Sequence, residues 1–229
     1  MKSVAIIPAR GGSKGIPKKN LKLFCGEPLI YWTIQAAKRS QKISTICVTS
    51  DSDEILEYCA SLKVTTIKRP AELSTDSIGT EPALFHALNE LGEKFNFSIL
   101  LQTTSPIRFA SQIDESIAML ESNQFDSVVS AVISDDFLIW HEKQKSAVSF
   151  NFNSDERGRR QDREVSCVEN GSIYAFKTED FLITRIRTFG RVGICPVPKW
   201  HLFELDEPGD WELVEHLFSA YLVAEKLKK

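Results

Sequence analysis

The residues best suited to chemistry near the start of the chain form a basic, glycine-containing segment, PARGGSKGIPKKN, at 8–20, directly after a short apolar run. Glycines let backbone N–H groups approach an anion closely, and cationic side chains neutralise a polyphosphate. The spacing matches neither the Walker loop nor the GxGxxG dinucleotide fingerprint. We interpret the segment as a candidate triphosphate site, with a solvated turn as the alternative. Its cations are Arg10, Lys14, Lys18 and Lys19, and its glycines are Gly11, Gly12 and Gly15.

A second polar segment, QTTSPIR at 102–108, follows the apolar residues of a predicted strand. The amide of Gln102 and the neighbouring hydroxyl groups suit sugar oxygens, and an arginine suits a charged substituent. Arg108 has an equally good alternative role, in which it only shapes the turn that opens the next helix.

An acidic segment, FELDEPGDWE at 203–212, places Glu204 and Asp206 two residues apart. In an extended strand both carboxylates would point to one side. Mg²⁺ binds through one or two such carboxylates together with substrate phosphates and water. Asp210 is predicted instead to complement the dipole of a final helix that begins near Pro208.

These segments share a resemblance to one family. ARGGSKGIPKKN resembles the ARxxSKGxxxKN signature of the CMP-sialic acid synthetases, also called acylneuraminate cytidylyltransferases. The same family has counterparts of RPAEL within 68–80, of LLQTTSPIR at 100–108, of RQ and NGSIY within 160–174, and of an acidic-x-Asp pair. The five motifs occur in the family's order from Ala5 to Trp211.

The resemblance implies particular roles. The basic segment would bind CTP, with its pyrimidine beside Gly11 and Asn20, and Gln102 would touch the acceptor sugar. Arg160 would bind the sugar or a phosphate. The implied catalytic residues are Arg10, Lys14, Lys19 and Asp206; the substrate-binding residues are Gly11, Asn20, Arg69, Thr80, Gln102, Arg160, Gln161, Asn170 and Tyr174; and the Mg²⁺ ligands are Asp206 and Glu204.

The elements that must position these residues follow from hydrophobic periodicity. Apolar runs alternate with helix-period stretches over the first two thirds of the chain, which is typical of βαβ units on a parallel sheet. We therefore predict one α/β domain over 1–229, with a mostly parallel, doubly wound sheet of the Rossmann-like, nucleotidyltransferase kind. Strands are expected at 3–9, 43–50, 65–68, 97–102, 127–133, 171–176 and 192–197, and helices at 28–40, 52–62, 80–94, 111–123 and 208–227.

The segment 135–165 departs from this pattern because it is polar and irregular, with Trp140, Phe150 and Phe152 interleaved. Such a segment is either a flexible lid or an arm that packs on another subunit. The family resemblance implies a dimerisation arm, and hence a homodimer with shared active sites.

Composition excludes other classes. With 28 Lys and Arg against 31 Asp and Glu, the net charge of -3 argues against a nucleic-acid partner, which requires a basic surplus. The sequence contains no run of about 18 apolar residues, so no membrane span is predicted. Five scattered cysteines without metal spacing favour reduced thiols and a cytoplasmic location.

The resulting expectation is a cytidylyltransferase that transfers CMP from CTP to the anomeric hydroxyl of a nonulosonic acid and releases pyrophosphate. The acceptor stays open: N-acetylneuraminic or legionaminic acid is favoured over pseudaminic acid or Kdo. A catalytically inactive nucleotide-binding module of the same fold is the alternative outside enzymes. No histidine pattern identifies a general base.

Overall fold

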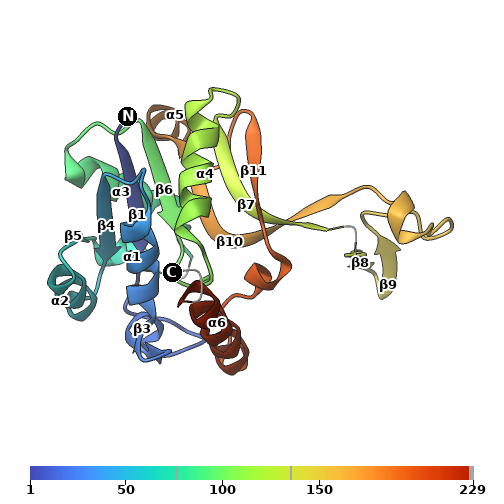
Figure 1. Cartoon of the computed structure of the whole chain (residues 1–229), viewed down its shortest axis with the longest axis horizontal. Coiled ribbons are helices and arrows are strands. Elements are labelled where there is room, and N and C mark those ends of the chain that lie inside the picture. The colour runs from blue at the N-terminus through green and yellow to red at the C-terminus, as the bar shows by residue number, and fades with distance from the viewer. Residues whose placement is uncertain (76, 135, 227–229) are drawn as a thin grey trace.

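A seven-stranded sheet with the order β11-β7-β10-β6-β1-β4-β5 forms the centre of the molecule (Figure 1). The computed structural model describes residues 1–75, 77–134 and 136–226. The strands of this sheet are β1 (Ser3–Pro8), β4 (Thr45–Ser50), β5 (Thr65–Lys68), β6 (Phe97–Leu101), β7 (Ser127–Ser134), β10 (Ser166–Lys177) and β11 (Val192–Val197).

Most neighbouring strands run parallel, which confirms the predicted fold class. β1 pairs in parallel with β4 and with β6, β4 with β5, and β7 with β11. Among the described strands of this sheet, only β10 is antiparallel to its neighbours, β6 and β7. Strands β1, β4, β5 and β6 therefore present their carboxyl ends at one edge of the sheet.

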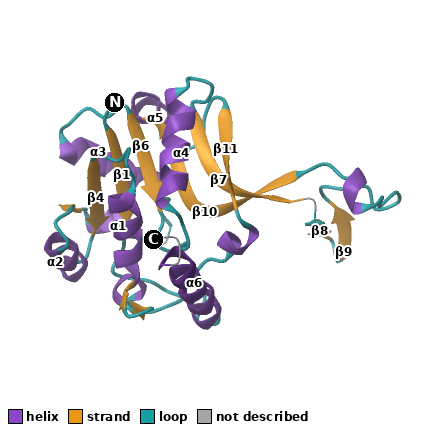
Figure 2. Cartoon of the chain, viewed as in Figure 1, coloured by secondary structure: helices purple, strands orange, loops and turns teal. Residues whose placement is uncertain are grey.

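Helices cover both faces of the sheet (Figure 2). Ala5 and Ile7 of β1 pack toward α1 (Leu29–Arg39), α2 (Asp53–Ser61) and α4 (Ala110–Glu121), whereas Val4 and Ile6 pack toward α3 (Glu81–Leu91) and α5 (Thr178–Thr184). The alternation follows because successive side chains of a strand point to opposite faces. Burial on both faces explains why β1 reads as an uninterrupted apolar run.

The last helix, α6 (Asp210–Lys226), packs in a separate cluster with Phe24 of the short strand β2 (Leu23–Phe24), which pairs with β3 (Glu27–Pro28). It begins two residues later than predicted, because Pro208 belongs to the turn before it. Its predicted end at Leu227 lies outside the described residues. Phe24 touches Trp211 edge-on and Phe218 at a tilt, which anchors α6 beside the start of α1.

The arm differs from its prediction in having regular structure. Within the segment expected to be irregular, β8 (Trp140–Lys143) and β9 (Ser146–Ser149) pair as an antiparallel hairpin, followed by a 3₁₀ turn, Arg160–Asp162. The hairpin projects away from the sheet on long extensions of β7 and β10 (Figure 1). Residue 135, the predicted first residue of the arm, lies outside the described residues.

Among the helices that the structure describes, none has the length and apolar character needed to cross a membrane. The five cysteines are free thiols, and three of them are buried.

Candidate active site

The main candidate site lies where the strand order changes direction. β1 is followed along the chain by β4 on one side of it, and the chain returns after β5 to place β6 on the other side. Ligands of open α/β sheets bind at such a point, outside the carboxyl ends of the strands. A cavity of about 380 Å³ opens there, lined by residues after β1, β5 and β6 and by Asp206.

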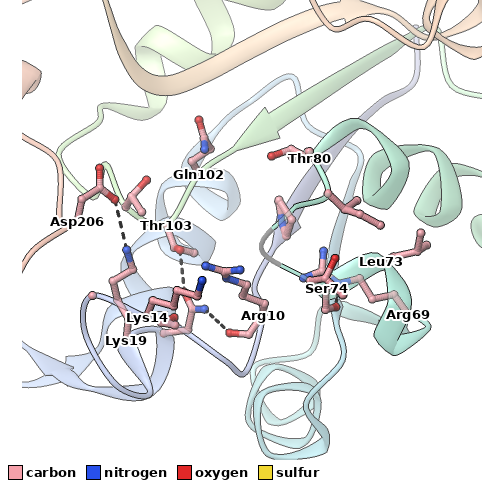
Figure 3. Close-up of a pocket in the computed structure, with 18 residues that line it drawn as sticks. Arg10, Lys14, Lys19, Arg69, Leu73, Ser74, Thr80, Gln102, Thr103 and Asp206 are labelled. Atoms are coloured by element: carbon pink, nitrogen blue, oxygen red, sulfur yellow. Dashed lines mark hydrogen bonds and ion pairs between the residues drawn. The ribbon is translucent and has the colours of Figure 1, made fainter.

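The cavity brings together much of the predicted site. In Figure 3, Arg10 extends into its centre, with Lys19 and Asp206 on one side and Arg69, Ser74 and Thr80 on the other. Basic side chains and a carboxylate therefore face a common space. The predicted residues that line it are Arg10, Lys14, Lys19, Asn20, Arg69, Thr80, Gln102 and Asp206.

Lys19 and Asp206 form one side of the cavity. The Lys19 ammonium donates to the Leu205 carbonyl at 2.6 Å and lies 3.5 Å from the Asp206 carboxylate. The Lys19 side chain is largely buried, whereas that of Asp206 is 66% exposed. Burial lowers the pKa of Lys19, and the charge of Asp206 opposes that shift. Asp206 thus presents an accessible carboxylate toward the cavity.

Asn20 lines the cavity, but its amide is already engaged. Its Nδ2 donates to the Arg10 carbonyl at 3.0 Å, and its Oδ1 accepts from the Thr103 hydroxyl at 2.7 Å. The side chain is buried. Asn20 therefore fixes the loop after β1 to the end of β6, a positioning contribution that its sequence motif did not reveal.

The glycines of the basic loop make different contributions. The Gly11 N–H donates to the Asp51 carboxylate at 2.9 Å, and Gly11 is absent from the cavity lining among the described residues. A Cβ on Gly15 would overlap the carbonyl oxygen of Asp206. Only a glycine lets the loop approach the segment that carries Asp206 this closely.

Gly15→Ala is expected to lower kcat/KM by at least about tenfold, because misplacing reacting groups by even about 1 Å is costly. Steady-state kinetics and a thermal melt would separate this loss from unfolding. Gly12→Ala is the matched control, since a Cβ there meets nothing within 4 Å. Equal activity of the two variants would contradict a requirement for the close approach.

The loop after β5 forms the opposite wall. Arg69 donates from Nε to the Ser74 hydroxyl at 2.8 Å, and burial lowers its pKa. Thr80 occupies the N-cap of α3, yet its side chain makes no capping hydrogen bond, and it lines the cavity instead. Sequence reasoning did not single out Ser13, Ser74 or Thr75 as site residues, although hydroxyl groups beside a basic loop are a usable signal.

Arg108 has the structural role that the sequence left open, which is to shape the turn after β6. Its guanidinium is buried and donates to Ser172 at 2.9 Å, to the Ser105 carbonyl at 2.7 Å and to the Gln102 carbonyl. Burial lowers its pKa to about 9. Arg108 therefore holds the turn that presents Gln102, whose side chain lines the cavity.

Glu204 is less accessible than Asp206. Its carboxylate packs against Gly171, where a Cβ would lie 2.5 Å from Oε1. Burial, aided by the charge of Asp206, raises its pKa to about 7. The segment 203–206 is a loop, so the expected strand geometry of the acidic pair was wrong. Over the described part of the chain, Glu204 does not line the cavity.

Asn170 and Tyr174 lie within the body of the protein, outside the cavity lining. Asn170 is fully buried, accepts from the Ser130 hydroxyl at 2.6 Å and donates to the His201 carbonyl at 3.1 Å. The Tyr174 hydroxyl donates to Glu169 at 2.9 Å, and burial raises its pKa. Both residues hold β10 in place around an irregularity between Glu169 and Tyr174.

Arg160 and Gln161 are exposed on the arm, and neither lines the described cavity of their own chain. Arg160 pairs with Asp136 at 2.6 Å, and Lys199 contacts the same carboxylate.

The fold resembles that of solved nucleotidyltransferases. A CMP:2-keto-3-deoxy-manno-octonic acid synthetase, solved with CTP, superimposes with a TM-score of 0.70 and covers 96% of this chain and 100% of its own, at 16% identity. A 4-diphosphocytidyl-2C-methyl-D-erythritol synthase from Anaerococcus prevotii superimposes with a TM-score of 0.66. It covers 95% of this chain and 96% of its own, at 13% identity. At these identities the likeness shows the fold alone.

A family model described as cytidylyltransferase matches residues 4–191, so the chain belongs to the cytidylyltransferase family, which confirms the resemblance drawn from its motifs. Among its relatives, an N-acylneuraminate cytidylyltransferase of Streptococcus agalactiae serotype III is 32% identical over the whole chain and 56% of its own length. N-acylneuraminate cytidylyltransferase B of Danio rerio is 33% identical over 92% of the chain and 50% of its own. The chain spans about half the length of these relatives.

Proposed function

We propose that this chain transfers CMP from CTP to the anomeric hydroxyl of a nonulosonic acid, releasing pyrophosphate. The observation that carries the proposal is the cavity at the switch point of the sheet, where Arg10, Lys14, Lys19 and Arg69 line one space together with the carboxylate of Asp206. The names of the relatives, N-acylneuraminate cytidylyltransferases, support a sialic-type acceptor. N-acetylneuraminic and legionaminic acid are the proposed acceptors, ahead of pseudaminic acid and Kdo.

In this reaction the sugar oxygen forms a bond to the α-phosphorus while the bond to pyrophosphate breaks, and the hydroxyl proton passes to water. Arg10, Lys14 and Lys19 would neutralise the phosphates as charge moves to the leaving group. Arg69 and Thr80, on the opposite wall, would hold the nucleoside. Gln102, at the end of β6, would orient the acceptor, with its backbone fixed by Arg108. Positioning and charge neutralisation carry such a transfer without a covalent enzyme intermediate.

Asp206 fits a Mg²⁺ ion, since its carboxylate is accessible at the cavity and Mg²⁺ commonly binds proteins through one or two carboxylates plus substrate phosphates. The described residues contain no cluster of three or more His, Cys, Asp or Glu that could hold a metal by protein ligands alone, which agrees with a site completed by substrate. When bound, the ion would supply positive charge to the transferring phosphoryl group.

CTP is expected to be preferred over ATP, GTP and UTP by at least about tenfold in kcat/KM, which corresponds to about 1.4 kcal/mol. The match to the cytidylyltransferase family supports this preference, and polar groups along the cavity wall can distinguish the cytosine amino group. Pyrophosphate release should be measured with each triphosphate and a panel of purified nonulosonic acids. Comparable release from a purine triphosphate would contradict the nucleotide assignment, and binding of CTP without release would favour the inactive module.

The arm is proposed to complete the site in a homodimer. Trp140 and Phe150 are 49% and 63% exposed on the hairpin, although large aromatic side chains favour buried contacts. Arg160 and Gln161 lie on the same arm, outside the cavity of their own chain. A second copy that receives the arm would bury the aromatic side chains and bring the two polar side chains to a substrate.

A dimer is expected by light scattering at micromolar concentration. Trp140→Glu combined with Phe150→Glu should give a folded monomer with sharply reduced activity, because a buried charge is costly at an interface. Ile183→Glu is the control, since Ile183 is exposed on the body of the protein, away from the arm. A stable wild-type monomer with full activity would rule out a shared site.

A further inference from the structure

The segment that carries Asp206 has no strand or helix to hold it, yet it is fixed from several sides. Leu205 is fully buried in the cluster around α6, and its N–H donates to the Thr104 carbonyl at 2.8 Å. Lys19 donates to the Leu205 carbonyl at 2.6 Å. These contacts fix Leu205, but they leave the N–H groups of Asp206 and of the residue after it to another partner.

Asp210 supplies that partner. One oxygen of its carboxylate, Oδ2, accepts from the Asp206 N–H at 3.0 Å and from the Glu207 N–H at 2.7 Å. Asp210 is the first residue of α6, and its own N–H donates to the Glu207 carbonyl at 3.1 Å. Within the described chain its side chain is not part of the cavity lining. The carboxylate therefore closes the turn around Asp206 without facing the substrate space.

We propose that Asp210 is a positioning residue that orients Asp206 by accepting the backbone N–H groups of Asp206 itself and of Glu207. This inference rests on the proposed function, in which Asp206 holds the metal. Charge-assisted hydrogen bonds from two successive amides fix the backbone rotation of the residue between them. Without them, the backbone at Asp206 can turn, and its carboxylate leaves the direction of Lys19 and the cavity.

The pair Asp210→Asn and Asp210→Ala tests the proposal, because an asparagine oxygen can still accept both N–H groups and an alanine cannot. Since the side chain at position 210 does not line the described cavity, Asp210→Asn should keep turnover within about threefold of wild type. Asp210→Ala should raise the Mg²⁺ concentration for half-maximal activity by about tenfold or more. Glu212→Gln and Glu212→Ala, which remove another acid from the first turn of α6, are matched controls and should behave as wild type.

A second readout does not depend on activity. Amide hydrogen exchange of a peptide covering 203–207, measured on metal-free protein, should be faster in Asp210→Ala and unchanged in Asp210→Asn and both Glu212 variants. Titration of Mn²⁺ with CTP present should show weaker binding to Asp210→Ala alone. If the alanine variant does not fold, Asp210→Ser, whose shorter side chain cannot span both amides, replaces it.

Loss of turnover in Asp210→Asn as severe as in Asp210→Ala would overturn the proposal, since the charge itself would then be required. Unchanged exchange and metal dependence in Asp210→Ala would overturn it as well, leaving Asp210 as a helix-dipole residue. A wild-type protein without CTP-dependent pyrophosphate release would instead refute the proposed function, while the exchange measurement would still report on Asp210.

Discussion

Asp206→Asn is expected to lower kcat by about 10²-fold or more while the protein stays folded, a loss typical of removing one group that stabilises a transition state. The substitution keeps the shape of the side chain, and the backbone N–H of Asp206 still donates to Asp210. It removes the accessible negative charge of the cavity wall. Activity as a function of Mg²⁺ concentration, together with a thermal melt, would measure the effect.

Glu207→Gln is the control for Asp206→Asn, because it removes a neighbouring exposed charge that does not line the cavity. A second consequence concerns Lys19. Burial lowers its pKa, and the negative charge of Asp206 raises it again. Losing Asp206 lowers that pKa further, so any residual activity should decline at a lower alkaline pH than in wild type. Retention of most magnesium-dependent activity in Asp206→Asn would show that another carboxylate holds the ion.

Lys19→Met and Arg10→Ala are each expected to lower kcat/KM by at least about tenfold, since a charge-assisted phosphate contact contributes roughly 1.5 to 3 kcal/mol. Methionine preserves most of the apolar stem of Lys19, which is largely buried, while removing its charge. Steady-state kinetics with CTP as the varied substrate would measure both losses.

Lys18→Ala is the matched control for Lys19. Its ammonium is exposed and pairs with Glu54 at 3.0 Å, on the outside of the same loop, and it does not line the described cavity. If folded Lys19→Met and Arg10→Ala proteins show near-normal rates, the basic loop has no role in catalysis and the alternative interpretation, a solvated turn, holds.

The sheet could be predicted because its central strands, such as β1 and β6, are buried on both faces, whereas the edge strands β5 and β11 are buried only in part. β5 and β11 have the predicted bounds, and β1 ends one residue early. β10 begins five residues before its predicted start, because its first residues extend into the arm, where burial alternates instead of being continuous. The hairpin of β8 and β9 was missed for a related reason: all four residues of β8 are exposed, so no apolar periodicity marks it.

The site was only partly predictable, because a sequence motif does not distinguish a residue that contacts substrate from one that holds the protein structure in place. Asn20 and Asn170 stand in polar motifs like Lys19 and Gln102, but their amides are bonded within the protein. The partner of Asn20, Thr103, lies 83 residues away, so only the folded chain reveals the contact. Arg160 shows a different limit of sequence-based prediction, because the site that it is proposed to serve belongs to a second copy of the chain.

The pairing of Ser134 with Ser166 closes β7 onto β10 at the base of the arm. In the topology of the sheet, the whole arm between these two serines is an insertion in the β-hairpin formed by β7 and β10. A short turn in its place would leave every ladder of the seven-stranded sheet and every loop around the cavity as they are. Within one chain the arm is therefore modular: its length and sequence can change while the strand pairing of the sheet stays the same.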